Sequence, residues 1–339
     1  MQTDLVVIGA GLAGLTAAWR AAALRQRVRV VTKGWGATHW GAGCIDVLGY
    51  HPRDDGPPLE SPAAGVEALI ASQPQHPYAL VGLEAIDRAL QALQALCAAA
   101  GYPLHGSLER NWWLPSAAGG VRPTCLAPET MIAGDLRRRE PMLLVGFDPF
   151  LDFFAAFAAD SLNAQGYLAR DVTLDLPRPE QRRLVNGTNL ARLFETEAFR
   201  AEVADALRPW LGDVARVGFP AVLGLRGDRA VAIQRDLATR LGREVFEIPV
   251  LPPSVPGMRL HHILVTAIEQ AGGRVFEGME AVQADGEDGR LTALSPMAMG
   301  QCARWSAVCR SRRCPRARRG SPASFWRRVA IRSSRPDWR

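Results

Sequence analysis

The sequence predicts an α/β protein built around a parallel β-sheet, and three observations near its amino terminus support this fold class. Leu5 to Ile8 form a short apolar run of the kind that makes a buried strand. A helix rich in alanine and leucine follows, and Val28, Val30 and Val31 supply a second strand. Strands that alternate with helices are typical of βαβ units, so we expect a Rossmann-like domain.

Three glycines lie between the first strand and the helix, with the spacing G-x-G-x-x-G. Gly9 would form the tight turn, Gly11 would let a pyrophosphate approach the backbone, and Gly14 would let the helix pack on the strand. The N–H groups of Gly11, Leu12 and Ala13 would then bind the anion. The motif alone is weak, but its strand and helix context predicts a dinucleotide or flavin site. The alternative is a βαβ core without a ligand.

The acidic residue that usually ends the second strand and binds ribose hydroxyls is missing. The sequence there reads Val31-Thr32-Lys33-Gly34. We expect Thr32 to hydrogen-bond the cofactor, and we expect Lys33 to favour a phosphate over a ribose diol. The glycine motif suggests FAD, while the missing acid argues against the usual adenosine contacts.

Two further segments carry candidate site residues. The loop GWGATHWGAGCIDVLG is rich in glycine and can lie over a flavin ring, so we predict that Thr38, His39 and Gly43 contact the flavin. Arg122, in the turn-rich segment SAAGGVRPTCLAP, is a candidate to bind a phosphate or carboxylate. A surface histidine and a solvated arginine are the alternatives.

No metal site is predicted. The six cysteines form no CxxC pair, and no acidic or cysteine partner is suitably spaced around His261 and His262. We expect these histidines to be surface or core residues.

The middle of the chain alternates between predicted strands and helices, which indicates an inserted α/β domain. We expect strands at 142–145, 221–225 and 245–251, and helices at 83–100, 189–210 and 229–241. A last unit has a helix that ends at Gly272-Gly273 and three short strands turned by Gly278 and Asp288-Gly289, the last of them Arg290 to Leu294.

The formal net charge of +6 comes from residues 295–339, which hold 12 of the 40 basic residues and one of the 34 acidic ones. Lys33 is the only lysine, which indicates GC-rich codons, and shifted frames of GC-rich DNA tend to encode Arg, Ser, Cys, Pro and Trp. We interpret this segment as out-of-frame translation, with a disordered tail or a nucleic-acid-binding arm as alternatives. We expect no nucleic-acid partner, no membrane span and no export signal, hence a cytoplasmic protein.

Residues 1–294 resemble the B subunit of the anaerobic glycerol-3-phosphate dehydrogenase. The motifs that carry the resemblance are DLVVIGAGLAGL, VVTKGWGATHWGAGCIDVL, HPYALV, GGVRPTCLAP, VGFDPFLDFFAAFAADSL and LPPSVPGMRLHHIL. It implies a Rossmann-like flavin-binding domain with an inserted α/β domain, and a C-terminal part of the flavin domain that is missing here. The corresponding divisions are 1–105, 106–255, 256–294 and the tail. The resemblance implies FMN, whereas the glycine motif suggests FAD.

The resemblance also implies a reaction and partners. Glycerol 3-phosphate would be oxidised to dihydroxyacetone phosphate, and electrons would pass to a membrane quinone. His39 and Arg122 are then the candidate catalytic residues. The partners would be a catalytic A subunit and a membrane-bound iron–sulfur C subunit, which would place the chain at the inner face of the membrane. The alternatives are a non-catalytic assembly or electron-relay subunit, and another FAD-dependent oxidoreductase.

Overall fold

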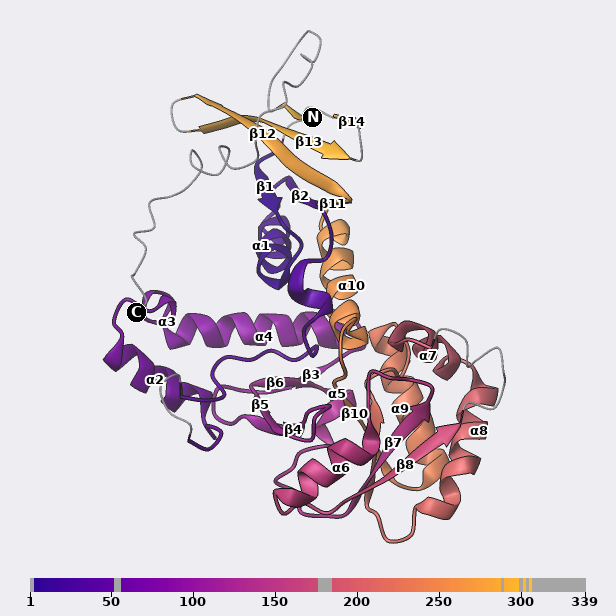
Figure 1. The fold of residues 1–339 in the computed structure, drawn as a ribbon. Helices are drawn as coiled ribbons and strands as arrows, with labels where there is room; N and C mark the ends of the chain where they lie inside the picture. Colours follow the sequence, from indigo (N-terminus) through magenta and orange to yellow (C-terminus); the bar gives the residue numbers. More distant parts are fainter. Residues whose placement is uncertain are drawn as a thin grey trace.

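The computed structural model describes residues 3–51, 56–175, 185–287, 290–298, 301–302 and 305–306. Its amino-terminal unit is a parallel sheet in the order β1-β2-β11. The strands are β1 (Leu5–Ile8), β2 (Val28–Thr32) and β11 (Arg274–Glu277), and helix α1 (Leu12–Ala23) connects the first two. Helix α10 (Val255–Gln270) packs against α1 beside this sheet (Figure 1). The predicted strand, turn, helix and strand are therefore confirmed.

A long hairpin covers the carboxyl end of this sheet. Strand β12 (Met279–Glu287) pairs antiparallel with β13 (Arg290–Ala298), and β13 also pairs with β14 (Gln301–Cys302) and β15 (Trp305–Ser306). β13 thus extends four residues beyond the expected end at Leu294, because the first residues of β12 pair with its second half. Residues 288–289, the predicted turn, and residues 307–339, most of the tail interpreted as out of frame, lie outside the described residues.

Helices and short hairpins form the middle of the molecule. The helices are η1 (Gly36–His39), α2 (Pro62–Ser72), α3 (Pro77–Val81), α4 (Leu83–Ala99) and α5 (Glu129–Ile132). Strand β3 (Leu104–Gly106) pairs with β6 (Leu126–Pro128), and β4 (Trp112–Pro115) pairs with β5 (Val121–Thr124). Arg122 therefore lies on a strand, and its expected place in a loop is wrong, because its neighbours pair with β4.

The inserted unit has a parallel sheet of its own, in the order β10-β9-β7-β8. Its strands are β7 (Met142–Asp148), β8 (Ala169–Asp175), β9 (Arg216–Pro220) and β10 (Glu244–Ile248), and its helices are α6 (Ala155–Ala164), α7 (Gly187–Phe194), α8 (Glu197–Leu207), η2 (Arg208–Trp210) and α9 (Gly227–Leu241). The strand expected at 221–225 lies instead at β9, and the helix expected at 189–210 is broken after Phe194.

The two larger hydrophobic cores hold these units. One lies around the inserted sheet and includes Phe147, Phe194 and Phe219, whose rings contact one another. The other joins α1, α4 and α10 to the first sheet. The α/β fold class is confirmed. Within the described residues, no helix is both long and apolar enough to cross a membrane.

Candidate cofactor site

The turn between β1 and α1 leaves the start of a helix open to a ligand. Gly9 has a φ of 106°, which favours glycine, and its N–H donates to the carbonyl of Val31 over 2.8 Å. A Cβ on Gly14 would lie 2.2 Å from the carbonyl oxygen of Gly9, so this position requires close helix packing. A Cβ on Gly11, by contrast, would meet nothing within 4 Å. Gly9 and Gly14 thus have the backbone environments that the motif predicts, and the space beside Gly11 is open, as the predicted approach of a pyrophosphate requires.

The start of α1 carries no side-chain cap. Gly11 is its N-cap residue, and no side chain accepts a hydrogen bond from the first turn. The N–H groups of Leu12, Ala13 and Gly14 have no acceptor within the helix, because the first turn of any α-helix lacks one. These groups and the positive end of the helix dipole are the donors that an anion could bind at this turn.

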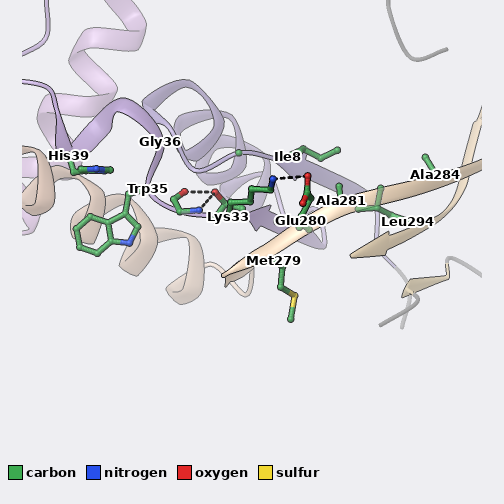
Figure 2. A pocket seen from close by; sticks show the side chains of 14 residues that line it. Ile8, Lys33, Trp35, Gly36, His39, Met279, Glu280, Ala281, Ala284 and Leu294 are labelled. Atoms are coloured by element: carbon green, nitrogen blue, oxygen red, sulfur yellow. Dashed lines mark hydrogen bonds and ion pairs between the residues drawn. The ribbon is translucent and has the colours of Figure 1, made fainter. Parts of the chain in front are cut away.

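A cavity of about 560 Å³ adjoins this turn, a size in the range of roughly 300–1,000 Å³ that is usual for ligand pockets. It lies between the carboxyl ends of β1 and β2, η1 and the β12–β13 hairpin (Figure 2). Apolar side chains form most of its wall. The cavity is lined by Ile8, Gly9, Val31, Thr32, Lys33, Gly34, Trp35, Gly36, His39, Met279, Glu280, Ala281, Ala284 and Leu294.

Thr32 holds the two neighbouring turns together. Its hydroxyl oxygen accepts from the N–H of Ala10 over 3.3 Å and from the N–H of Gly34 over 3.2 Å. The same hydroxyl donates to the carbonyl of Gly34. Thr32 lines the cavity, but these bonds occupy its hydroxyl, so it positions the backbone around the site.

Lys33 lines the cavity together with a carboxylate that the sequence analysis did not identify. Its ammonium group lies 2.8 Å from Glu280 of β12, and the two side chains are 70% and 47% exposed. Figure 2 shows this ion pair next to the apolar wall. The sequence does not indicate that Glu280 lies at this site, because Glu280 is 247 residues from Lys33 in the chain. The signal that could have found it is the pairing of β11 with β2, which brings the start of β12 to the end of β2.

Helix η1 packs between the glycine turn and the start of α10. A Cβ on Gly36 would lie 3.1 Å from the Cα of Gly11, and a Cβ on Gly257 would lie 2.0 Å from the carbonyl oxygen of Thr38. Gly43 faces Pro256, and a Cβ added to Gly43 would lie 2.3 Å from the Cβ of Pro256. Gly43 therefore allows a close protein contact, which differs from the predicted close approach to a flavin.

Thr38 and His39 have polar atoms without hydrogen-bond partners. The Thr38 hydroxyl and His39 Nδ1 are both buried, and no described residue bonds to either. The carbonyl oxygen of His39 accepts from the N–H of Ser254 over 2.6 Å, which fixes the backbone. His39 also lines the cavity, while its Nδ1 is buried.

Trp35, which lines the cavity, stacks on His261. Their ring centroids are 4.6 Å apart at an interplanar angle of 19°, and Trp35 Nε1 donates to Glu277 over 3.2 Å. Burial lowers the pKa of His261, and the negative charge of Glu277 opposes this shift. We expect His261 to be either a surface or a core residue, and the structure shows that it is a core residue, because it is only 4% exposed.

Arg122 lies outside the cavity lining and already has a carboxylate partner. Its guanidinium is 2.5 Å from Asp46, and the Thr124 hydroxyl donates to the other oxygen of Asp46 over 2.5 Å. Burial raises the pKa of the neighbouring Cys44 to about 12. Asp46 belongs to the same loop as His39, so the structure connects Arg122 to this loop without bringing it into the cavity.

A buried ion pair joins α10 to the inserted unit. Because η1 packs against the start of α10, the pair also supports this side of the site. Arg259 Nη1 lies 2.6 Å from Glu247 of β10, and both side chains are fully buried. The Arg259 guanidinium also donates to the carbonyl of Gly224 and to the Tyr102 hydroxyl, while Glu247 accepts from the N–H of Leu223. Burial raises the pKa of Tyr102 to about 12, so its hydroxyl remains protonated.

Comparisons with known proteins agree with this site. A family model described as an FAD binding domain matches residues 4–293. The B subunit of the anaerobic glycerol-3-phosphate dehydrogenase of Pectobacterium carotovorum is 34% identical over 294 residues, which cover 84% of this chain and 68% of that relative. The probable B subunit of the same dehydrogenase in Halobacterium salinarum is 35% identical over 301 residues, with 84% and 67% covered. The flavin prediction is confirmed, and the match agrees with FAD, the form that the glycine motif suggests.

Among solved structures, the 3-ketosteroid delta1-dehydrogenase of Sterolibacterium denitrificans is 17% identical, with a TM-score of 0.36 over 90% of this chain and 46% of that chain. This likeness is too weak to support a conclusion about the site.

Proposed function

The chain belongs to the family of anaerobic glycerol-3-phosphate dehydrogenase B subunits and to that of FAD-binding domains, and on this premise we propose that it is the flavoprotein subunit of a quinone-linked glycerol-3-phosphate dehydrogenase. The observation that carries the proposal is the open face at Gly11, where an uncapped helix start adjoins the 560 Å³ cavity. A cofactor with a diphosphate and flat apolar rings fits this combination of donors and apolar walls.

The residues that would hold FAD follow from this geometry. The N–H groups of Gly11, Leu12 and Ala13 would bind its diphosphate, since they face outward at the positive end of α1. Thr38 and His39 would face the bound cofactor from η1, and Thr32 and Lys33 would contact it from the end of β2. When bound, FAD would supply the two-electron acceptor for the reaction.

The substrate chemistry requires a proton acceptor and an anion-binding group. Oxidation of the secondary alcohol of glycerol 3-phosphate to dihydroxyacetone phosphate releases two electrons and two protons. His39, which lines the cavity, is the residue that would take the hydroxyl proton. Arg122 would bind the substrate phosphate, because a guanidinium binds phosphate bidentately.

A second candidate function rests on the position of Arg122. It pairs with Asp46 and lies outside the cavity lining, so substrate and flavin would not meet without a rearrangement. This observation favours a non-catalytic assembly or electron-relay subunit. The relatives are B subunits, and their name implies partner subunits. We propose a catalytic A subunit and a membrane-bound iron–sulfur C subunit as the partners, with this chain peripheral at the cytoplasmic face.

An anaerobic titration distinguishes the two functions. The isolated flavin-loaded chain is mixed with glycerol 3-phosphate, and the visible flavin absorbance is recorded over time. A catalytic subunit is expected to lose this absorbance, with one dihydroxyacetone phosphate formed per flavin reduced. Glycerol, which lacks the phosphate, is the matched control. An unchanged spectrum with the isolated chain, together with turnover only in the assembled complex, would support the relay function.

A further inference from the structure

The glycine turn, the cavity and the Lys33–Glu280 ion pair form one continuous site. This site contains a carboxylate that can replace the acidic residue missing from the end of β2. In dinucleotide-binding folds, an acidic residue at the end of the second strand accepts hydrogen bonds from the ribose hydroxyls. Lys33 stands near that position here and can accept no hydrogen bond. A carboxylate is nevertheless present, because Glu280 reaches the same place from β12.

The strand pairing explains how Glu280 comes to this position. β11 runs parallel to β2, and Glu277 is in register with Thr32. The carboxyl ends of the two strands therefore lie at the same edge of the sheet. Gly278, with a φ of 71°, turns the chain directly into β12, so that Glu280 returns beside Lys33.

The cavity wall around this pair is suited to a planar apolar base. Ile8 is 62% exposed at the end of β1, which is unusual for a strand residue of this type. Met279, Ala281 and Leu294 of the hairpin add further apolar side chains to the cavity lining (Figure 2). A base that enters between these walls would cover Ile8 and leave its sugar near Glu280.

We propose that Glu280 recognises the ribose of the adenosine half of the cofactor, in place of the acid that β2 lacks, and that Lys33 orients its carboxylate. This inference rests on the proposed flavin site, and it makes Glu280 the residue that selects adenine dinucleotides over FMN. Solvent strongly screens ion pairs as exposed as this one, so Glu280 can readily exchange Lys33 for another hydrogen-bond partner. Glu280 can therefore accept from a ribose diol while it keeps or releases Lys33.

The first test needs no mutation. ADP and 2′-deoxy-ADP are titrated into the flavin-free chain by calorimetry, and their dissociation constants are compared. Loss of the hydroxyl is expected to weaken binding about tenfold, the effect of one hydrogen bond to a charged group. Equal binding of the two nucleotides would overturn the role of Glu280 while leaving the glycine turn intact. Failure of both ADP and FAD to bind would overturn the proposed function as well.

The second test uses Glu280→Gln, with Glu84→Gln, a change at an exposed side chain of α4, as the matched control. Glu280→Gln is expected to weaken FAD and ADP binding about tenfold, to leave FMN binding unchanged and to abolish the preference for ADP over 2′-deoxy-ADP. Adding Lys33→Glu to this variant should restore FAD binding, since it returns a carboxylate to the end of β2. If FAD binding did not recover, or if FMN binding fell equally, the proposal would be wrong.

A third comparison tests the competing role of Lys33 as a phosphate ligand. ADP is compared with the same nucleotide carrying a 2′-phosphate. The proposal predicts weaker binding of the phosphorylated form, because Glu280 repels it. Tighter binding that is lost in Lys33→Met would assign the site to a phosphate and overturn the proposal.

Discussion

Replacing Glu247 by glutamine is expected to destabilise the whole site through the buried pair that holds α10. The carboxylate accepts from Arg259 over 2.6 and 2.9 Å and from the N–H of Leu223 over 2.8 Å. Glutamine keeps one acceptor, but its amide group would face the guanidinium and leave a fully buried charge without a counterion. Breaking a buried pair in this way costs about 3–5 kcal/mol.

Urea unfolding, followed by tryptophan fluorescence, measures this loss. With a slope of about 3 kcal/mol per M, the midpoint should fall by about 1–1.7 M. Glu84→Gln breaks an exposed pair with Arg88 and is expected to cost at most about 0.5 kcal/mol. The double variant Glu247→Met, Arg259→Met should recover much of the loss, because it removes both charges. A loss below about 1 kcal/mol for Glu247→Gln would refute the view that this pair fixes α10.

Three further changes test other parts of the site. Gly14→Ala should destabilise the fold by about 1–3 kcal/mol in urea unfolding, since the new Cβ would lie 2.2 Å from Gly9. His261→Gln should flatten the dependence of the melting temperature on pH: burial lowers the pKa of His261, so the unfolded chain takes up the proton first and stability falls as pH decreases below about 6.5. Arg122→Lys should reduce kcat/KM for glycerol 3-phosphate by about tenfold in the reconstituted complex, with flavin content unchanged, because lysine cannot bind bidentately.

Each of these has an outcome that contradicts it. Wild-type stability of Gly14→Ala would mean that α1 does not pack on the turn as described. An equally steep pH dependence in His261→Gln would assign the acid sensitivity to another group. Unaltered kinetics of Arg122→Lys would leave Arg122 as the structural partner of Asp46 only.

Local features of the site could be predicted from the sequence because they depend on neighbours in the chain. The turn at Gly9, Gly11 and Gly14 lies within one strand–helix unit, and each glycine has the environment that the spacing implies. Cavity residues from η1 were also predicted, as His39 shows. The assigned contacts of Thr38 and His39 with a flavin remain predictions.

Other features depend on pairing between distant segments, which the sequence does not reveal. Glu280 joins the site because β11 pairs with β2, and Asp46 lies beside Arg122 because a backbone bridge joins Ile45 to Leu126. The position of β9 was missed because the apolar run continues past Pro220 into a buried turn, so hydrophobicity alone does not mark where the strand ends.

The measurement that tests the central claim most directly is the flavin content of the purified chain, compared between the wild type and a variant in which a side chain fills the open space beside Gly11. Flavin released by denaturation is identified and quantified per chain for the wild type, Gly11→Val and Gly187→Ala, a control glycine at the start of α7 whose added Cβ would meet only ordinary contacts at 3.7 Å. We predict FAD in the wild type and the control, and its loss from Gly11→Val at unchanged folding. Equal flavin in all three proteins would contradict the assignment of the glycine turn as the cofactor site.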